Sequence, residues 1–213
     1  MSNILLIGNG AREHALAEAI ARSEQKPQLF SFMKSNNPGI AALSAKTMLG
    51  SYAHLEAITE FAAENKIEFA VIGPEDPLHN GVADALAEIN IPSVGPTKSL
   101  ARLETSKSFT RDLVSKYNIP GNPQFKVFKA MEGVEDFLNK LEGIVLKPDG
   151  LTGGKGVMVQ GDHFATKEEA LEHCKQILAS GSSLIVEEKF DGEEFSLQCL
   201  CDGNTVVATP LVQ

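Results

Sequence analysis

The sequence has 213 residues, 43% of them apolar and 22% charged, and its 19 basic and 28 acidic side chains give a formal net charge of −9. This is the composition of a globular protein with one large domain or two small ones. The acidic balance argues against a general binder of nucleic acid or anionic membranes but leaves room for a local basic pocket, and the low aromatic content, without tryptophan, argues against a base-stacking platform.

The first 95 residues alternate short apolar runs with segments of helical period. We expect strands at residues 4–7, 29–33, 69–72 and 91–94, and helices along the apolar stripes at 11–20, 55–62 and 82–89. Strands that alternate with helices imply right-handed crossovers and a parallel sheet. The sequence therefore predicts a doubly wound α/β fold for this half.

The pattern changes in the second half. Helical spacing covers residues 100–117 and stops at 118–123, where two prolines and a glycine form a candidate linker. Beyond it we expect strands at 124–128, 144–147, 157–160, 184–188 and 195–201, helices at 134–141 and 170–178, and a hairpin turn at 202–204. This half is predicted to be α+β with antiparallel strands. Residues 205–213 remain strand-like and apolar, so we expect a truncated molecule.

Three cysteines, Cys174, Cys199 and Cys201, cannot all pair, which fits a reduced, cytoplasmic location. Cys199 and Cys201 lie two residues apart in a strand-like stretch and so share one face. We expect them to be small core thiols and not metal ligands or a redox pair. No apolar run approaches the roughly 18 residues of a membrane span.

Residues 8–13 (GNGARE) form a strand-to-helix turn, where backbone N–H groups and the helix dipole favour an anion. The turn resembles the start of a dinucleotide fingerprint, but Glu13 replaces the third glycine. The second strand also ends at Lys34-Ser35, without the acidic residue that holds a ribose. The turn suits a phosphate, with Arg12 as a second contact, and NAD binding is disfavoured. A merely tight turn is the alternative.

Residues 73–77 (GPEDP) follow a predicted strand and therefore lie at the carboxyl edge of the sheet, where open α/β folds bind ligands. The adjacent carboxylates of Glu75 and Asp76 could accept hydrogen bonds from sugar hydroxyls or an amine. Residues 36–39 (NNPG) would face the same edge. A proline-stiffened loop with solvated acids is the alternative.

The most specific signal is residues 144–160, a glycine-rich turn between two strands with Lys147 and Lys155 on its two sides. Glycines allow close approach of the backbone to phosphate, and the lysines supply positive charge. A P-loop is excluded, because Asp149 stands where that motif needs glycine and a strand follows. A mobile hairpin lid over a triphosphate fits better than an ordinary glycine hairpin.

Residues 184–195 are predicted to form a buried strand that runs into five carboxylates. The main chain after the strand could contact an adenine, and one of the carboxylates could hold a ribose. The alternative is a solvated loop. The five histidines show neither metal-ligand nor hydrolase spacing. His14 alone lies near a candidate site.

Together these stretches resemble the phosphoribosylamine–glycine ligase family of the ATP-grasp superfamily. The resemblance lies in residues 8–15, 71–78, 94–97, 103–110, 147–157 and 187–194, in this order over the whole sequence. It implies a Rossmann-like substrate domain at 1–103 and part of an ATP-grasp domain at 104–213, with a lid subdomain at about 121–188. Two departures are Ala11, where the family often has glycine, and the order of residues 36–40 (NNPGI).

The resemblance also implies site residues. The nucleotide would be bound by Lys107 and Lys147 on the phosphates, the flap residues Leu151, Gly153, Gly154, Lys155, Gly156 and Val157, the main chain of Glu187 and Lys189 on adenine, and Glu194 on the ribose. The phosphoribosylamine would be bound by Gly10, Arg12, Glu13, Gly39, Gly73, Pro74 and Glu75. No catalytic or metal-binding side chain is expected before Gln213.

The implied reaction joins glycine to 5-phosphoribosylamine with ATP through a glycyl phosphate, using Mg²⁺ or Mn²⁺ held by residues beyond Gln213. We expect a monomer or weak dimer, and no turnover by these 213 residues alone. A sister ATP-grasp purine ligase and a non-catalytic nucleotide-binding module remain alternatives.

Overall fold

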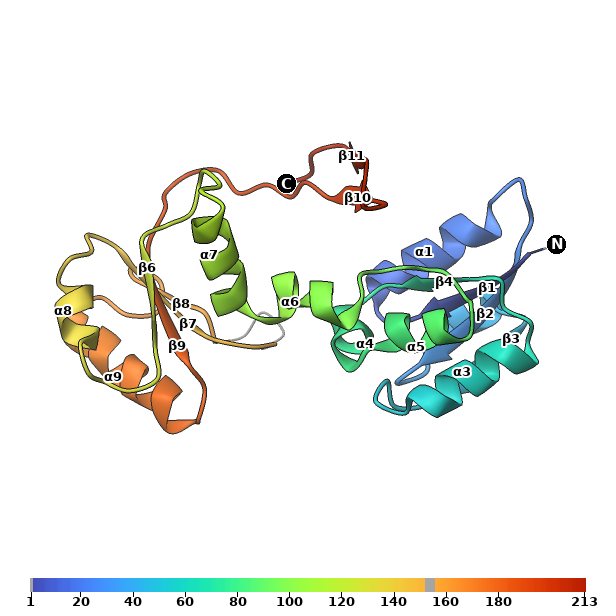
Figure 1. The fold of residues 1–213 in the computed structure, drawn as a ribbon, viewed down its shortest axis with the longest axis horizontal. Coiled ribbons are helices and arrows are strands. Elements are labelled where there is room, and N and C mark those ends of the chain that lie inside the picture. Colours follow the sequence, from blue (N-terminus) through green and yellow to red (C-terminus); the bar gives the residue numbers. More distant parts are fainter. Residues whose placement is uncertain (1, 152–155) are drawn as a thin grey trace. The chain divides into compact units, whose positions relative to one another are not determined.

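The computed structural model describes residues 2–151 and 156–213. The chain forms two compact units, residues 1–119 and 120–213 (Figure 1). The division falls inside the proline- and glycine-containing segment 118–123. Gly153, Gly154 and Lys155, which the sequence places in a phosphate flap, lie outside the described residues.

The first unit is built on a parallel sheet of five strands in the order β3-β2-β1-β4-β5. The strands are β1 (Asn3–Ile7), β2 (Gln28–Met33), β3 (Lys46–Leu49), β4 (Phe69–Ile72) and β5 (Ser93–Val94). The helices are α1 (Ala11–Ala21), α2 (Pro38–Leu43), α3 (Leu55–Glu64), α4 (Glu75–Asn80), α5 (Val82–Glu88), α6 (Lys98–Thr105) and α7 (Lys107–Lys116). The predicted doubly wound parallel fold is confirmed.

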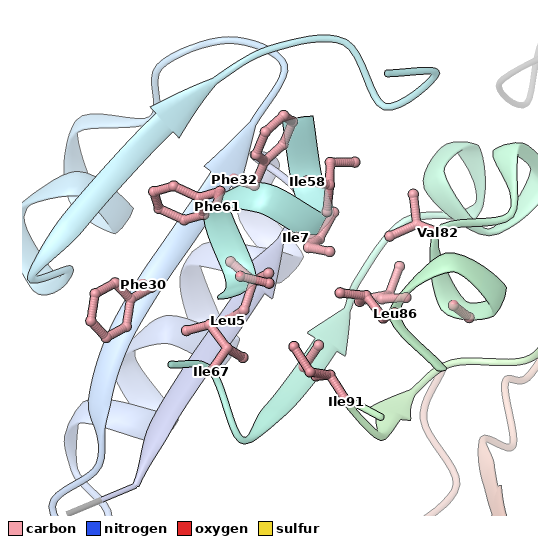
Figure 2. Packing of buried hydrophobic residues seen from close by; sticks show 14 of the residues in the cluster. Leu5, Ile7, Phe30, Phe32, Ile58, Phe61, Ile67, Val82, Leu86 and Ile91 are labelled. Carbon is pink, nitrogen blue, oxygen red and sulfur yellow. The ribbon is translucent and has the colours of Figure 1, made fainter. Parts of the chain in front are cut away.

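Both faces of this sheet are covered, and the alternation of side chains along β1 shows how. Leu5 and Ile7 belong to the larger core, which α3 and α5 complete with Ile58 and Leu86 among others (Figure 2). Leu6 points to the other face, where α1 and α2 close a smaller core. Because β1 is buried on both sides and lies between β2 and β4, its carboxyl end is flanked by two loops.

Four features of this unit differ from the sequence prediction. The short helices α2 and α4 occupy segments that were expected to be loops, and the other two features are strand β3 and a break in a predicted helix. Strand β3 was not predicted, because it lies at the sheet edge and three of its four residues are exposed, so it has no apolar run. The helix expected along residues 100–117 is interrupted at Ser106. This residue ends α6, and its hydroxyl accepts the N–H of Phe109 to cap α7.

The second unit contains an antiparallel sheet of four strands in the order β6-β9-β7-β8, as predicted for this half. Its elements are β6 (Phe125–Phe128), α8 (Val134–Leu138), β7 (Ile144–Pro148), β8 (Met158–Val159), α9 (Lys167–Ala179) and β9 (Leu184–Glu188). A core that includes Phe128, Leu146, Cys174 and Leu184 lies between the sheet and the two helices. The α+β character is thus confirmed.

The last elements, β10 (Cys199–Cys201) and β11 (Val206–Ala208), pair only with each other among the described strands. The predicted hairpin is present, but the strand expected at 195–201 is limited to its last three residues. Cys199 and Cys201 are exposed, so the expectation that they are core thiols is wrong. The reason is that nothing in the described chain packs on this hairpin, every residue of which is exposed. None of the described helices is long and apolar enough to cross a membrane.

Candidate functional site: a glycine-lined sheet edge and a buried lysine–carboxylate pair

The first candidate site lies where β1 passes into α1. Gly8 has a φ of +134°, a conformation that favours glycine, and its N–H donates to the carbonyl of Phe32 at 3.1 Å. Gly10 is the N-cap of α1, and its N–H donates to Oε2 of Glu13 at 2.6 Å. Glu13 is only 3% exposed, and its second oxygen, Oε1, is buried without a hydrogen-bond partner.

Glu13 and the next residue, His14, reach the loops on opposite sides of β1. A Cβ on Gly73, directly after β4, would lie 2.5 Å from Oε1 of Glu13. A Cβ on Gly39, the second residue of α2, would lie 2.9 Å from Nδ1 of His14. Both glycines therefore leave room for a side chain from the first turn of α1. The structure brings Gly10, Glu13 and Gly73 together and places Gly39 against His14.

A polar network fixes the loop after β2. The amide oxygen of Asn37 accepts the N–H groups of Gly39 and Ile40 and so caps α2, while its Nδ2 donates to the carbonyl of Asn9 at 3.1 Å. Oδ1 of Asn9 accepts the Tyr52 hydroxyl at 2.8 Å. Because Asn37 performs this cap, the sequence order NNPG gives the loop a defined conformation.

Burial raises the pKa of the Tyr52 phenol above its ordinary value; the N–H of Lys34 opposes this effect, and the carboxyl groups of Glu13 and Asp76 add to it. The phenol therefore stays protonated at neutral pH and can donate to Asn9.

Two ion pairs join this edge to the start of α4. Arg12 lies 3.6 Å from Glu75, and Nζ of Lys34 lies 3.4 Å from Asp76. All four side chains are at least one-third exposed, so each pair is weak and its partners can exchange for a ligand. The edge thus combines two cations suited to a phosphate with two carboxylates suited to hydroxyls or an amine.

Lys34, Asn9 and Tyr52 were missed as site residues by sequence reasoning. Lys34 directly follows β2 at the ligand edge, so its position could have indicated a ligand contact. From the sequence, this position indicated only that no acidic residue is present to hold a ribose. Tyr52 contacts Asn9 across 43 positions of sequence, and no local pattern predicts such a contact.

The second candidate site is in the antiparallel sheet. Lys147 near the end of β7 and Glu187 on the neighbouring strand β9 form an ion pair of 2.6 Å. The carboxylate is nearly fully buried, and the lysine side chain is 21% exposed. A lysine whose ammonium group is held by a buried carboxylate and whose side chain stays partly exposed can serve as a fixed positive charge for an anion.

The turn that follows Lys147 depends on glycine. Gly150 and Gly156 have φ values of +100° and +96°, which other residues rarely adopt. A Cβ on Gly156 would lie 3.2 Å from Cγ of Pro148, so the two sides of the turn are close there. Leu151 is exposed and Val157 half-buried.

The segment after β9 is fixed at its first residue, Lys189. The N–H of Lys189 donates to the carbonyl of Gly143 at 3.0 Å, and its Nζ lies 3.6 Å from Asp191. A main-chain contact of Lys189 with an adenine would therefore use its carbonyl. Glu194 is exposed. Lys107 is the first residue of α7, in the first unit.

No group of three or more histidine, cysteine or carboxylate side chains that could hold a metal ion occurs within residues 2–151 and 156–213.

Comparison with known proteins gives this arrangement a class. Residues 105–213 match the family model "Phosphoribosylglycinamide synthetase, ATP-grasp (A) domain", so the antiparallel unit with its lysine and glycine turn is of the ATP-grasp class. Residues 2–104 match "Phosphoribosylglycinamide synthetase, N domain". The chain belongs to the phosphoribosylglycinamide synthetase family.

Individual relatives agree with the family models. The phosphoribosylamine–glycine ligases of Methanosarcina barkeri and Methanocaldococcus jannaschii are each 46% identical to this chain, over 210 and 218 residues, and each match covers 99% of it. These alignments cover 48% and 49% of the relatives. The chain thus spans about half the length of the curated relatives it matches.

Solved structures show the same fold. The phosphoribosylamine–glycine ligase of Thermotoga maritima has a TM-score of 0.77 and 26% identity over 99% of this chain and 50% of that one. An N5-carboxyaminoimidazole synthetase from Staphylococcus aureus, solved with ADP, has a TM-score of 0.78 over 99% of this chain and 54% of its own, at 14% identity. The second likeness concerns the fold alone.

Proposed function

We propose that this chain serves the ATP-dependent ligation of glycine to 5-phosphoribosylamine, which yields glycinamide ribonucleotide, ADP and phosphate. The supporting observation is that the two matched family models together extend from residue 2 to residue 213, across both candidate sites. In this reaction the glycine carboxylate takes the terminal phosphoryl group of ATP and releases ADP. The amine of the sugar then attacks the glycyl carbonyl, and phosphate leaves.

The glycine-lined edge of the parallel sheet is proposed as the sugar-phosphate site. Arg12 and Lys34 would exchange their weak carboxylate partners for the phosphate, close to the N-terminus of α1. Glu75, released from Arg12, would accept hydrogen bonds from ribose hydroxyls. Gly10, Gly39, Gly73 and Pro74 would allow the ligand to approach the backbone, with residues 1–103 as the substrate domain.

The antiparallel unit is proposed to hold ATP, within an ATP-grasp portion at residues 104–213 and a lid at about 121–188. The pair fits this role, because the buried carboxylate of Glu187 holds the ammonium group of Lys147, whose side chain is still partly exposed. Lys147 and Lys107 would bind phosphate oxygens, and the flap from Leu151 to Val157 would cover them. Glu187 and Lys189 would contact adenine through main chain, and Glu194 the ribose.

A divalent cation, Mg²⁺ or Mn²⁺, is proposed to accompany the nucleotide and to neutralise the charge on its phosphates. The protein would act in the cytoplasm, as a monomer or weak dimer.

Binding of a non-hydrolysable ATP analogue tests the nucleotide site. The substitution Lys147→Ala is expected to weaken binding by about tenfold or more, because a charge-assisted phosphate contact is lost. The matched control is Lys175→Ala, which removes an exposed lysine paired with Glu172 on α9. Equal affinity of Lys147→Ala and the wild-type chain would contradict the assignment.

Ligation is tested with a coupled assay of ADP release. The 213-residue chain is expected to show no turnover. A chimera that adds the second half of the Methanosarcina barkeri relative is expected to release ADP only when both glycine and 5-phosphoribosylamine are present. Robust turnover by the 213 residues alone would show that the proposed division of labour is wrong, and a chimera active with another amine acceptor would favour a sister ligase.

A further inference from the structure

Glu13 is unusual in both its place and its environment. It stands at the third glycine position of a dinucleotide-type turn, where glycine normally permits close packing of helix and strand. Here the position carries a carboxylate that is 97% buried, as its 3% exposure shows. A group of this kind needs a physical reason to be there, because burial of a carboxylate is unfavourable.

Capping of α1 accounts for only one of its two oxygens. Oε2 accepts the N–H of Gly10 at 2.6 Å, whereas Oε1 is buried without a hydrogen-bond partner. A glutamate at this helical position can cap while its other oxygen stays in water. Helix stability alone therefore does not explain why the side chain extends inward and leaves an acceptor unsatisfied.

The glycines around Glu13 match its shape. A Cβ on Gly73 would lie 2.8 Å from Cδ of Glu13, and a Cβ on Gly8 would lie at the same distance from this carbon and from Cδ of Pro74. The carboxyl group thus fills the space between the turn at 8–10 and the loop at 73–75. The two loops follow neighbouring parallel strands, β1 and β4, and the first turns of the helices after them carry the Arg12–Glu75 pair.

Direct contact of Glu13 with a ligand does not fit this geometry. Oε1 is buried and lies against Gly73. A ligand could reach it only if the loop at 73–75 moved away.

We propose that Glu13 is a positioning residue that braces the 8–10 turn against the 73–75 loop and so sets the spacing of the ligand-facing groups at this edge. In this arrangement Glu13 supports the loops and does not touch the sugar phosphate. The brace itself follows from the contacts of Glu13; its effect on ligand affinity rests on the proposed function.

The first experiment measures the brace without a ligand, by a double-mutant cycle on the 213-residue chain. Gly73 does not have a positive φ, so Gly73→Ala acts mainly through its clash with Glu13. This substitution is expected to lower the denaturation midpoint of the first unit. Adding Glu13→Ala should then recover part of the loss, because the clash is relieved, although Glu13→Ala alone is destabilising.

The matched control is Gly50→Ala, whose Cβ would lie 2.7 Å from Cζ of Phe32 and whose nearest neighbours all belong to that ring. Its effect should add to that of Glu13→Ala. Strict additivity for Gly73 and Glu13 as well would overturn the brace.

The second experiment separates bracing from ligand contact, using ribose 5-phosphate as the probe and NMR titration as the measurement. In Glu13→Gln the amide oxygen must face the N–H of Gly10, which puts the NH₂ group where Oε1 lies. If Glu13 only braces, Glu13→Gln should keep the affinity within about threefold, whereas Glu13→Ala should lose about tenfold or more. The exposed Glu18 of the same helix supplies the control Glu18→Ala, which should bind like the wild type.

An equal loss in Glu13→Gln and Glu13→Ala would instead identify Glu13 as a hydrogen-bond acceptor for the ligand, and the proposal would be wrong. If the wild-type chain does not bind ribose 5-phosphate, the sugar-phosphate assignment fails, while the double-mutant cycle still decides the brace. If Gly73→Ala does not fold, the brace is tested by NMR on Glu13→Ala instead, by comparing the amide signals of Gly73 and Glu75 with those of the wild type. Unchanged signals would then count against the brace.

Discussion

At the scale of single residues, burial separates the three cysteines. Cys174 lies in the core of the second unit, and burial raises the pKa of its thiol to about 11. Cys199 and Cys201 are exposed on one face of the terminal hairpin. Since the thiolate is the reactive form, these cysteines should differ strongly in chemistry.

A thiol-reactive probe is therefore expected to label Cys199 and Cys201 rapidly at neutral pH and Cys174 only after denaturation. Mass spectrometry of peptides after labelling identifies the sites. The variant Cys174→Ala should label to the same extent as the wild type under native conditions. Rapid native labelling of Cys174 would show that the second core is open.

The same thiol predicts a dependence of stability on pH. In the unfolded chain Cys174 loses its proton near the ordinary value of 9.0, whereas in the folded chain it does so near 11. The unfolded state therefore gives up its proton first, and stability is lost as pH rises from about 9 to about 11. Denaturant titrations across this window should show a smaller loss in Cys174→Ala.

Individual site residues also show where sequence reasoning ends. Glu13, Gly73 and Glu75 could be selected because each follows a predicted strand at the ligand edge, and the topology of a parallel sheet brings such positions together. The ion pair of Lys34 with Asp76 joins residues 42 positions apart. The buried pair of Lys147 with Glu187 depends on the register of β7 against β9. Neither pairing has a local pattern, so both required the structure.

At the scale of elements, α9 is fixed by a capping box. Thr166 accepts the N–H of Glu169, and the Glu169 carboxylate accepts the N–H groups of Ala165 and Thr166. These two backbone bonds lower the pKa of Glu169 below its ordinary value of 4.5. The helix they begin carries Ala170 and Cys174 into the core, so its start matters to the whole unit.

Thr166→Ala is expected to lower the stability of the second unit by about 1 kcal/mol, as loss of an N-cap does. The contribution of Glu169 is complete above its ordinary pKa and is lost as pH falls below about 4.5 toward the lowered value. Chemical denaturation of the wild type and of Thr166→Ala at pH 7 and in acid measures both effects. Glu172→Ala, on the exposed face of α9, is the control and should change little.

Elements were predictable where burial imposes a period. The strands β1, β2, β4 and β9 are rich in buried apolar residues, and they were predicted within one residue. Strand β3 and the break at Ser106 were not predicted, since an exposed edge and a single capping hydroxyl leave no hydrophobic pattern. The hairpin was predicted from its turn, but its exposure was not, because alternation alone does not reveal whether a partner surface exists.

At the scale of the whole molecule, each hydrophobic core is formed by residues of one unit only. Every buried residue in the two clusters of the first unit lies between Leu5 and Ile91. The cluster of the second unit lies between Phe128 and Val186. A unit with its own core and no core residue from the other is expected to fold independently.

Residues 1–119 expressed alone should therefore unfold cooperatively, with a midpoint within about 4 °C of the same transition in the 213-residue chain. Calorimetry of the two proteins measures this, with residues 120–213 as the complementary sample. If the isolated first unit lacked a cooperative transition, contacts across the division would be essential to it.

The terminal hairpin has a consequence for how the protein behaves in concentrated solution. Its strands carry Leu200, Val206 and Val207 on a fully exposed two-stranded ribbon. Unpaired strand borders with apolar side chains are templates for adding a further strand from another molecule. Aggregation of the protein in concentrated solution should thus depend on this ribbon. Val207→Lys should slow aggregation without altering the five-stranded or the four-stranded sheet.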